Sequence, residues 1–134
     1  MRDLQRRIHR LCDAGRLDAE CVDSFLEVRL GDHTRTQRVR FGVTDGIAWF
    51  ESTVLSTARV GDWGDDWHSL ARAAWIRNDI GGLVGFGFDD RDRLVGRVEV
   101  PLATLDDPEI VASVRELAAE CDRFERAVVG GDEE

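Results

Sequence analysis

Lysine, long apolar runs and paired-cysteine motifs are all missing from this 134-residue chain, whose eighteen basic residues are all arginine. The arginine usage indicates a GC-rich genome or a salt-adapted host rather than a function. Because the longest apolar runs have only a few residues, no segment is predicted to cross a bilayer. Positive charges near the N-terminus have no apolar stretch behind them, so we predict no secretory signal. We therefore expect a cytoplasmic protein without a membrane partner.

Basic residues are also outnumbered, because 27 acidic residues give the chain a net charge of −9. A nucleic-acid-binding protein needs a basic face, so nucleic acid is not the expected partner. Arg2, Arg6, Arg7 and Arg10 do cluster near the N-terminus. We interpret them as a solvated helix face, and the alternative is a small patch that docks anions.

Cysteine is scarce, and Cys12, Cys21 and Cys121 form no CxxC pair. In a cytosolic chain we expect them to be reduced and mostly buried. His9 and Cys12 lie one helical turn apart and Cys21 follows, so a metal site or a small enzyme centre is conceivable. Zinc takes about four ligands, and a fourth is not evident. We predict no metal and no cofactor, and we keep this cluster as an alternative.

Catalytic motifs are absent as well. The sequence contains no GxSxG, HExxH or phosphate-loop pattern. His33 falls in a predicted turn and His68 in a predicted helix, and both are far in sequence from His9. Surface or capping roles explain these histidines better than general-base chemistry. We therefore predict a protein that is not an enzyme.

The first part of the chain predicts one helix and a three-stranded meander. A narrow apolar stripe marks the helix: Leu4, Ile8 and Leu11. Residues 16–21 should form a connection or a short turn. From residue 22 the apolar period changes to two, and short polar turns at residues 31–34 and 44–46 separate three strands that end at residue 55.

A second helix should begin at Asp65 and Asp66, whose carboxylates suit its N-terminal amides, and end at Gly81-Gly82. Its predicted contact stripe is Trp67, Leu70, Ala71, Ala74, Trp75 and Asn78. A β-hairpin follows and ends at Pro101. Its acidic turn, DDRDR, lacks the glycine and the distant glutamate of an EF-hand loop, so we interpret it as a solvated turn.

Gly85 and Gly87 lie on one face of the first hairpin strand. Glycine weakens a strand interior and often marks a close approach by another element. We therefore expect close packing at these two residues, against a helix of the same chain or against a second subunit.

The last helix has the most regular period, carried by Ile110, Val114, Leu117, Cys121, Phe124 and Val128. Asp107-Pro108-Glu109 should begin it with a capping carboxylate, and Gly130-Gly131 should end it. We expect residues 1–130 to form one domain and residues 131–134 a solvated acidic tail. The predicted class is α+β, in the order helix, three strands, helix, two strands, helix, with an antiparallel sheet packed by helices.

Four aromatic residues are the candidate protein-binding residues: Trp49, Phe50, Trp63 and Trp67. Core packing is the competing interpretation, above all for Trp49 and Trp67. Trp63 lies between two Gly-Asp pairs in a predicted loop. Exposed aromatics in polar surroundings are typical of interaction sites, so Trp63 is the best candidate for a partner contact.

The order of elements resembles the type III secretion chaperone-like fold, which is shared by the Tir chaperone (CesT) family and the YbjN-like family. Three segments carry the resemblance: Trp75-Ile76-Arg77-Asn78 at a helix end, Gly85-Phe86-Gly87-Phe88-Asp89 with Leu94-Val95-Gly96-Arg97 in the hairpin, and Pro101-Leu102 with Cys121-Asp122-Arg123-Phe124-Glu125 near the C-terminus. The likeness covers about residues 20–130. It is most specific after residue 70, and the C-terminal end is nearer the YbjN-like pattern.

This resemblance implies an acidic cytoplasmic protein that forms a homodimer and needs no cofactor. In the secretion chaperones, the dimer holds an extended segment of a client protein along apolar patches and strand edges, and we expect the same role here. The YbjN-like family implies instead a regulatory interaction domain that binds a folded partner. The arginine-rich first helix and the glycine-rich hairpin depart from the family pattern, so the client and the dimer geometry stay open.

Overall fold

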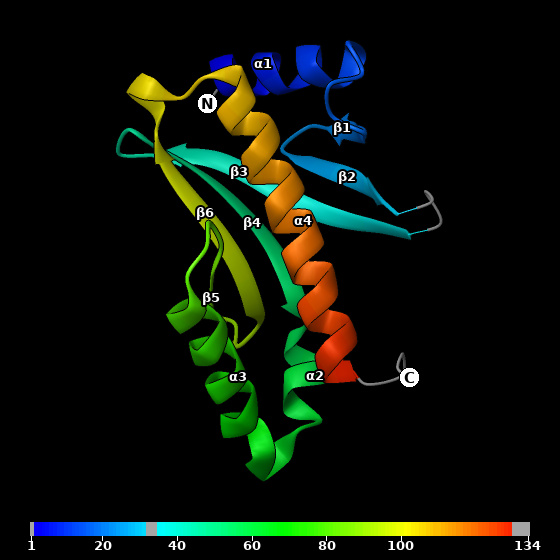
Figure 1. Cartoon of the computed structure of the whole chain (residues 1–134), viewed down its shortest axis with the longest axis vertical. Helices are drawn as coiled ribbons and strands as arrows, with labels where there is room; N and C mark the ends of the chain where they lie inside the picture. Colours follow the sequence, from blue (N-terminus) through cyan, green and yellow to red (C-terminus); the bar gives the residue numbers. More distant parts are fainter. Residues whose placement is uncertain (1, 32–34, 130–134) are drawn as a thin grey trace.

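The computed structural model describes residues 2–31 and 35–129, which fold into four helices and a six-stranded antiparallel sheet (Figure 1). In chain order the elements are α1 (Arg2–Asp13), β1 (Ala19–Val22), β2 (Phe25–Leu30), β3 (Arg35–Thr44), β4 (Ile47–Leu55), α2 (Thr57–Gly61), the 3₁₀ turn η1 (Gly64–Asp66), α3 (Trp67–Ile80), β5 (Gly85–Phe88), β6 (Leu94–Pro101), the 3₁₀ turn η2 (Leu102–Thr104) and α4 (Asp107–Val129). This is the α+β class that the sequence predicts. No helix within the described ranges is long and apolar enough to cross a membrane.

The sheet is open and has two edge strands. The strand order is β1-β2-β3-β4-β6-β5, so β1 and β5 each have one side that pairs with no other strand of the sheet. α4 runs diagonally over one face of the sheet, and α1 lies near the start of α4 (Figure 1). α3 packs beside β5. We call the sheet face that is turned away from α4 the outer face.

The core forms where the alternating side chains of the strands meet α4. Leu26, Phe41 and Phe50 point into it and are almost fully buried. The periodic residues of α4 from Ile110 to Phe124 are buried as predicted, and so is the apolar stripe of α1. The two helices are tied together by Arg7, whose Nη2 donates to the Leu105 carbonyl oxygen at 2.8 Å and contacts Asp107 at 3.2 Å.

Two short elements were not predicted. Residues 19–21 of β1 fall in the predicted connection, and Val22 falls at the predicted start of the first strand, because four residues are too few to show a period of two. α2 follows β4 directly, with Ser56 as its cap, where no helix was expected. Residues 32–34 of the predicted turn, the predicted helix stop at residues 130–131 and the predicted acidic tail lie outside the described residues.

The cap of α4 lies one residue earlier than predicted. Asp106 Oδ1 accepts from the Glu109 N–H at 2.8 Å, and Glu109 Oε1 accepts from the Asp106 N–H at 2.9 Å. This reciprocal pair is a capping box. The capping carboxylate is therefore that of Asp106, not that of Asp107.

The contact stripe predicted for α3 is largely wrong. Only Leu70 and Ala74 are buried, while Trp67 is 53% exposed and Trp75 is 64% exposed. The reason is that α3 packs against a four-residue edge strand, which offers too little surface to cover both tryptophans. Asp66 precedes the helix as expected, but its side chain makes no capping hydrogen bond.

Close packing at glycine occurs at residues other than those predicted. A Cβ at Gly85 would meet only a carbonyl oxygen at 3.9 Å, and one at Gly87 would meet nothing within 4 Å. The tight positions are Gly42, where a Cβ would lie 2.4 Å from Cζ2 of Trp49, and Gly96, where it would lie 2.5 Å from Sγ of Cys121. The prediction that Gly85 and Gly87 pack against a helix of this chain is thus wrong. Their packing against a second subunit stays a prediction.

Replacing Gly96 with alanine should lower the free energy of unfolding by about 1–3 kcal/mol, because the new methyl group overlaps the Cys121 thiol and two further side chains. Gly87→Ala, in the paired strand of the same hairpin, should change it by less than about 0.5 kcal/mol, since the space beside it is open. Urea unfolding of both variants measures the difference. Equal effects would contradict the packing described for α4 and β6.

Candidate protein-binding surfaces

Two of the four predicted aromatic contact residues are placed against the core. Phe50 is fully buried, because the alternation of β4 turns it toward the helix-covered face, so it cannot reach a partner. Trp63 is half-buried and packs against the core instead of projecting from its loop. It shares a shallow cleft with Leu55 and Val128. These placements correct the expectation for Phe50 and for the exposure of Trp63.

Trp49 lies on the outer face, where local contacts hold it. Its ring covers Gly42, and its Nε1 donates to Thr44 Oγ1 at 3.2 Å. The guanidinium carbon of Arg97 lies 4.9 Å from the ring centroid. Trp49 is thus half-buried among residues of its own sheet, and a role in partner binding stays a prediction.

Paired charges cover much of the outer face, next to a groove lined by Gly85, Gly87 and Val95. Glu27 pairs with Arg38 at 2.8 Å, and Arg38 in turn lies over the Phe25 ring at 4.1 Å. Glu51 bridges Arg40 at 2.8 Å and Arg97 at 3.1 Å. Such partly exposed pairs each contribute little to stability. They do make this face polar, so it does not provide the apolar patch that an extended client would need.

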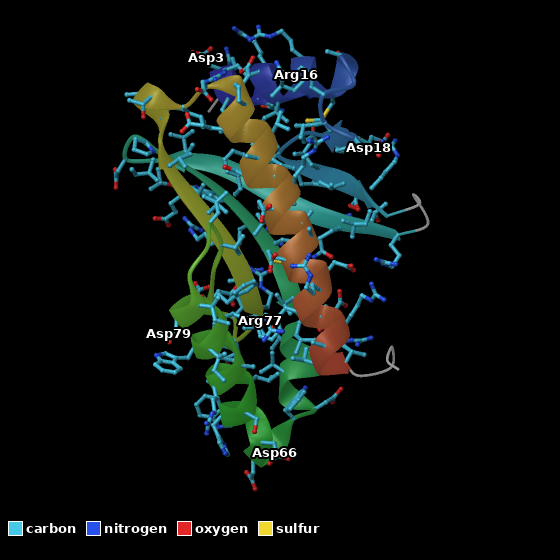
Figure 2. All side chains as sticks on the ribbon, viewed as in Figure 1. Asp3, Arg16, Asp18, Asp66, Arg77 and Asp79 are labelled. Carbon is cyan, nitrogen blue, oxygen red and sulfur yellow. The ribbon has the colours of Figure 1, made fainter. Side chains whose placement is uncertain are left out.

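The exposed apolar residues gather instead on α3. Trp75, Ile76 and Ile80 are exposed on this helix, as are Arg72 and Asp79, and Ile80 also lines a cleft with Arg77 and Glu120. We call these five exposed residues the α3 face. Figure 2 shows Asp79 on the side of α3 that is turned away from α4, and Arg77 on the opposite side, in the space between the two helices. Exposed apolar residues that gather in this way mark interaction sites in many proteins.

Arg77 fixes α3 to α4. Its guanidinium carbon lies 3.8 Å from the Phe124 ring centroid, and its Nη1 donates to the Ala73 carbonyl oxygen at 3.4 Å. Burial lowers the pKa of Arg77, although nearby Glu120 acts in the opposite direction. Because this contact holds the inner side of the helix, the α3 face is left pointing outward.

The two edge strands differ in what their outward backbone groups contact. In β1, the Arg29 N–H donates to the Asp18 carbonyl oxygen at 2.9 Å, and Ala19 lies opposite Val28. Hydrogen-bonded pairs alternate along an antiparallel ladder, so Ala19 and Cys21 turn their N–H and C=O groups away from β2. Within the described part of the chain we find no hydrogen bond to those outward groups.

In β5, the same alternation turns the N–H and C=O groups of Phe86 outward, because Asp89 N–H bonds the Arg93 carbonyl oxygen and Gly87 lies opposite Val95. Both outward groups of Phe86 are taken by one side chain. Asn78 Oδ1 accepts from the Phe86 N–H at 2.8 Å, and Asn78 Nδ2 donates to the Phe86 carbonyl oxygen at 2.8 Å. No described residue therefore bonds the outward groups of Ala19 and Cys21 in β1, whereas those of Phe86 in β5 are already bonded.

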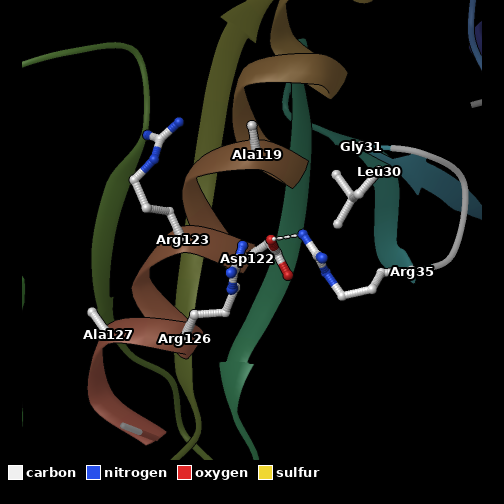
Figure 3. Close-up of a pocket in the computed structure, with 8 residues that line it drawn as sticks. All are labelled: Leu30, Gly31, Arg35, Ala119, Asp122, Arg123, Arg126 and Ala127. Atoms are coloured by element: carbon white, nitrogen blue, oxygen red, sulfur yellow. Dashed lines mark hydrogen bonds and ion pairs between the residues drawn. The ribbon is translucent and has the colours of Figure 1, made fainter. Parts of the chain in front are cut away.

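A groove of about 440 Å³ lies between the far end of the β2–β3 pair and the second half of α4 (Figure 3). Asp122 stands at its centre and binds Arg35 Nη2 at 3.0 Å, and Arg123 and Arg126 line the same groove. Arg123 also pairs with Glu120. Because acidic side chains accompany the arginines, the groove is a charge-paired junction between α4 and β3 rather than a basic patch.

The acidic hairpin turn is organised by its own residues. Asp89 Oδ1 accepts from the N–H groups of Arg91 at 3.0 Å and Arg93 at 2.9 Å, and Oδ2 binds Arg93 Nε at 2.7 Å. Burial acts to raise the pKa of Asp89, but these hydrogen bonds outweigh it and the pKa is lowered. The carboxylate has a structural role in the turn.

The three residues considered for a metal site, His9, Cys12 and Cys21, differ in their exposure. His9 is exposed on α1, whereas Cys12 and Cys21 are half-buried. Among residues 2–31 and 35–129, no three His, Cys, Asp or Glu side chains gather in a way that could hold a metal ion. All three cysteines are free, but only Cys121 is buried, so the expectation that most of them are buried is wrong.

Each thiol is held in its protonated form. Burial, followed by the influence of Cys12, Asp13 and Asp23, raises the pKa of Cys21 to about 11. Burial also raises the pKa of Cys12 and takes that of Cys121 to about 12. A nucleophilic cysteine has a lowered pKa, and the shift of these three thiols is in the opposite direction.

The alkylation rate of Cys21 by iodoacetamide should therefore keep rising up to about pH 10, roughly tenfold per pH unit, because only the thiolate reacts. An ordinary thiol levels off at lower pH. Peptide mapping by mass spectrometry separates Cys21 from Cys12, and Cys21→Ser confirms the assignment. A plateau near pH 8 would contradict the raised pKa.

Sequence reasoning missed the outer edge of β1, the α3 face and the role of Asn78. Trp75, Ile76 and Ile80 were visible as apolar residues, but helical spacing alone does not tell a core stripe from an exposed one. The Asn78 contact joins a helix end to a strand eight residues later, and only the fold brings them together.

No protein-family model and no curated protein matches the chain. Among solved structures, it is similar to the crystal structure of the ExsC-ExsE complex, with 15% identity, a TM-score of 0.59 and 92% of each chain covered. It is also similar to the Yersinia pestis type III secretion chaperone SycH in complex with a stable fragment of YscM2. That likeness has 9% identity, a TM-score of 0.50 and covers 85% of this chain and 92% of the other. Across most of its length, then, this chain has the fold of type III secretion chaperones.

Proposed function

We propose that this protein is a non-enzymatic, chaperone-like binding module that acts in the cytoplasm as a homodimer and holds an extended segment of a client protein. The observation that carries this proposal is the outer edge of β1, with backbone groups available for strand addition. The fold supports it, because the SycH structure contains a fragment of a second protein and the ExsC structure is likewise a complex.

Strand addition is the mode of binding that the β1 edge favours. The N–H and C=O groups of Ala19 and Cys21 would pair with the backbone of the client, which gives affinity without a demand on sequence. Val22 adds apolar surface beside them, since it is 38% exposed. Selectivity would come from such side-chain contacts on either side of the added strand.

A second copy of the chain is the occupant that best fits the α3 face. In a two-fold symmetric contact, residue i of one subunit meets residue j of the other and the reverse. Arg72 lies three residues before Trp75, and Asp79 lies three residues after Ile76. Two α3 helices that cross antiparallel at Trp75 and Ile76 would bring each Arg72 near the other Asp79, so the face is complementary to itself in charge.

Cys21→Pro should reduce the capture of client at least about tenfold, because proline removes an outward N–H from β1. Cys21→Ala, which keeps the N–H, should bind as the wild type does. Tagged wild-type and variant proteins incubated with lysate of the native host would be compared by quantitative mass spectrometry. Thermal unfolding checks that both variants are folded.

Specific proteins captured equally by both variants would exclude strand addition at β1, and an absence of any specific captured protein would contradict the proposed function. Protection of an extended segment of the captured protein in hydrogen exchange would separate a client from a folded partner.

Ile76→Asp should shift the protein from dimer to monomer, raising the dimer dissociation constant at least about tenfold, because two carboxylates would meet at the crossing point. Val129→Asp is the matched control, since Val129 is 45% exposed and Ile76 is 41% exposed. Light scattering over a concentration series measures the mass of each variant.

A charge exchange tests the register of the dimer. Arg72→Asp alone should weaken the dimer, and Arg72→Asp combined with Asp79→Arg should restore its stability. A wild-type monomer would contradict the homodimer. It would instead favour the alternative, a YbjN-like regulatory domain whose α3 face binds a folded partner.

A further inference from the structure

The outer edge of β5 is contacted by a side chain that imitates a neighbouring strand. In an antiparallel ladder, a hydrogen-bonded residue pair exchanges both its N–H and its C=O bonds. The carboxamide of Asn78 makes the same exchange with Phe86, through two hydrogen bonds of 2.8 Å. A carboxamide carries the same donor and acceptor as a peptide group, so it can replace one residue of a partner strand.

The contact is not needed to end α3. The backbone alone ends the helix: Gly81 has a φ of 93°, and its N–H donates to the Asn78 carbonyl oxygen at 3.1 Å. The side chain of Asn78 is thus available for β5. Beyond Phe86, the next residue with outward backbone groups is Phe88, and its ring packs edge-on against Trp67 with centroids 6.3 Å apart.

Along β1, at the opposite edge, no described residue forms an equivalent cap. Among the described residues, the comparable side-chain contact near β1 is that of Gln5, whose Nε2 donates to the Asp23 carbonyl oxygen at 2.8 Å. Asp23 lies in the turn after the strand, so Ala19 and Cys21 are unaffected.

We propose that Asn78 closes the outer edge of β5 against strand addition, so that the sheet can accept an added strand at β1 alone. An exposed edge strand is a template for pairing with other chains, and folded proteins protect such edges with short strands or covering elements. Both edge strands have four residues and a helix in contact with them, so the feature particular to β5 is the Asn78 carboxamide, which bonds the N–H and C=O groups of Phe86. The consequence for β1 rests on the proposed function, whereas the closure of β5 does not.

Removing the cap should cause self-association. Asn78→Ala frees the Phe86 N–H and C=O groups, and we expect association that binds thioflavin T to proceed about tenfold faster than in the wild type. Rates would be compared by fluorescence and light scattering at the same folded fraction for every variant, so that a loss of stability alone does not raise them.

Two double variants show whether Asn78→Ala acts by exposing the edge of β5 or by loosening α3. Asn78→Ala with Phe88→Pro removes the next outward N–H, and its association rate should return to that of the wild type. Asn78→Ala with Phe88→Ala loses the same aromatic contact but keeps the N–H, so it should associate as fast as Asn78→Ala.

Equal rates for the two double variants, or an unchanged rate for Asn78→Ala, would overturn the proposal. The assay contains no client. A failure here is therefore distinct from a failure of client capture at β1.

Discussion

The main constraint on this structure is the unpaired backbone at the two edges of the sheet. An open six-stranded sheet must leave one side of β1 and one side of β5 without a strand partner. Unsatisfied N–H and C=O groups invite pairing, whether with a specific client or with another copy. The two edges differ: the Asn78 side chain bonds the outward groups of Phe86 in β5, whereas no described residue bonds those of Ala19 and Cys21 in β1. The proposed function follows from this asymmetry.

The remaining elements hold the edges in place. α4 covers the central strands, and Asp122 joins it to β3 through Arg35. Cys121 packs so closely on Gly96 that a Cβ at residue 96 would overlap its thiol, and this contact holds β6 against the helix. Arg77 then locks α3 beside β5 by its contact with Phe124. With its inner side fixed, α3 presents Trp75 and its apolar neighbours outward, where a second subunit could cover them.

Most of the fold was predictable because its long elements have strong periods. The stripe of α4 and the alternation of β2 to β4 follow directly from the sequence, and the hairpin turn needed no metal to explain its acids. β1 is too short for a period to show, and its role depends on being at an edge, which is a property of the sheet order. Phe50 and Trp75 illustrate the limit for binding residues: both are large and apolar, and only packing decides that one is buried and the other exposed.

The central claim is that a client segment adds as a strand to β1. Amide hydrogen exchange of this protein, alone and with a captured client bound, tests it most directly. The account predicts that the amides of Ala19 and Cys21 become protected on binding, while that of Phe86, already bonded to Asn78, changes little. Protection confined to α3 or to the outer face, with β1 unchanged, would contradict it.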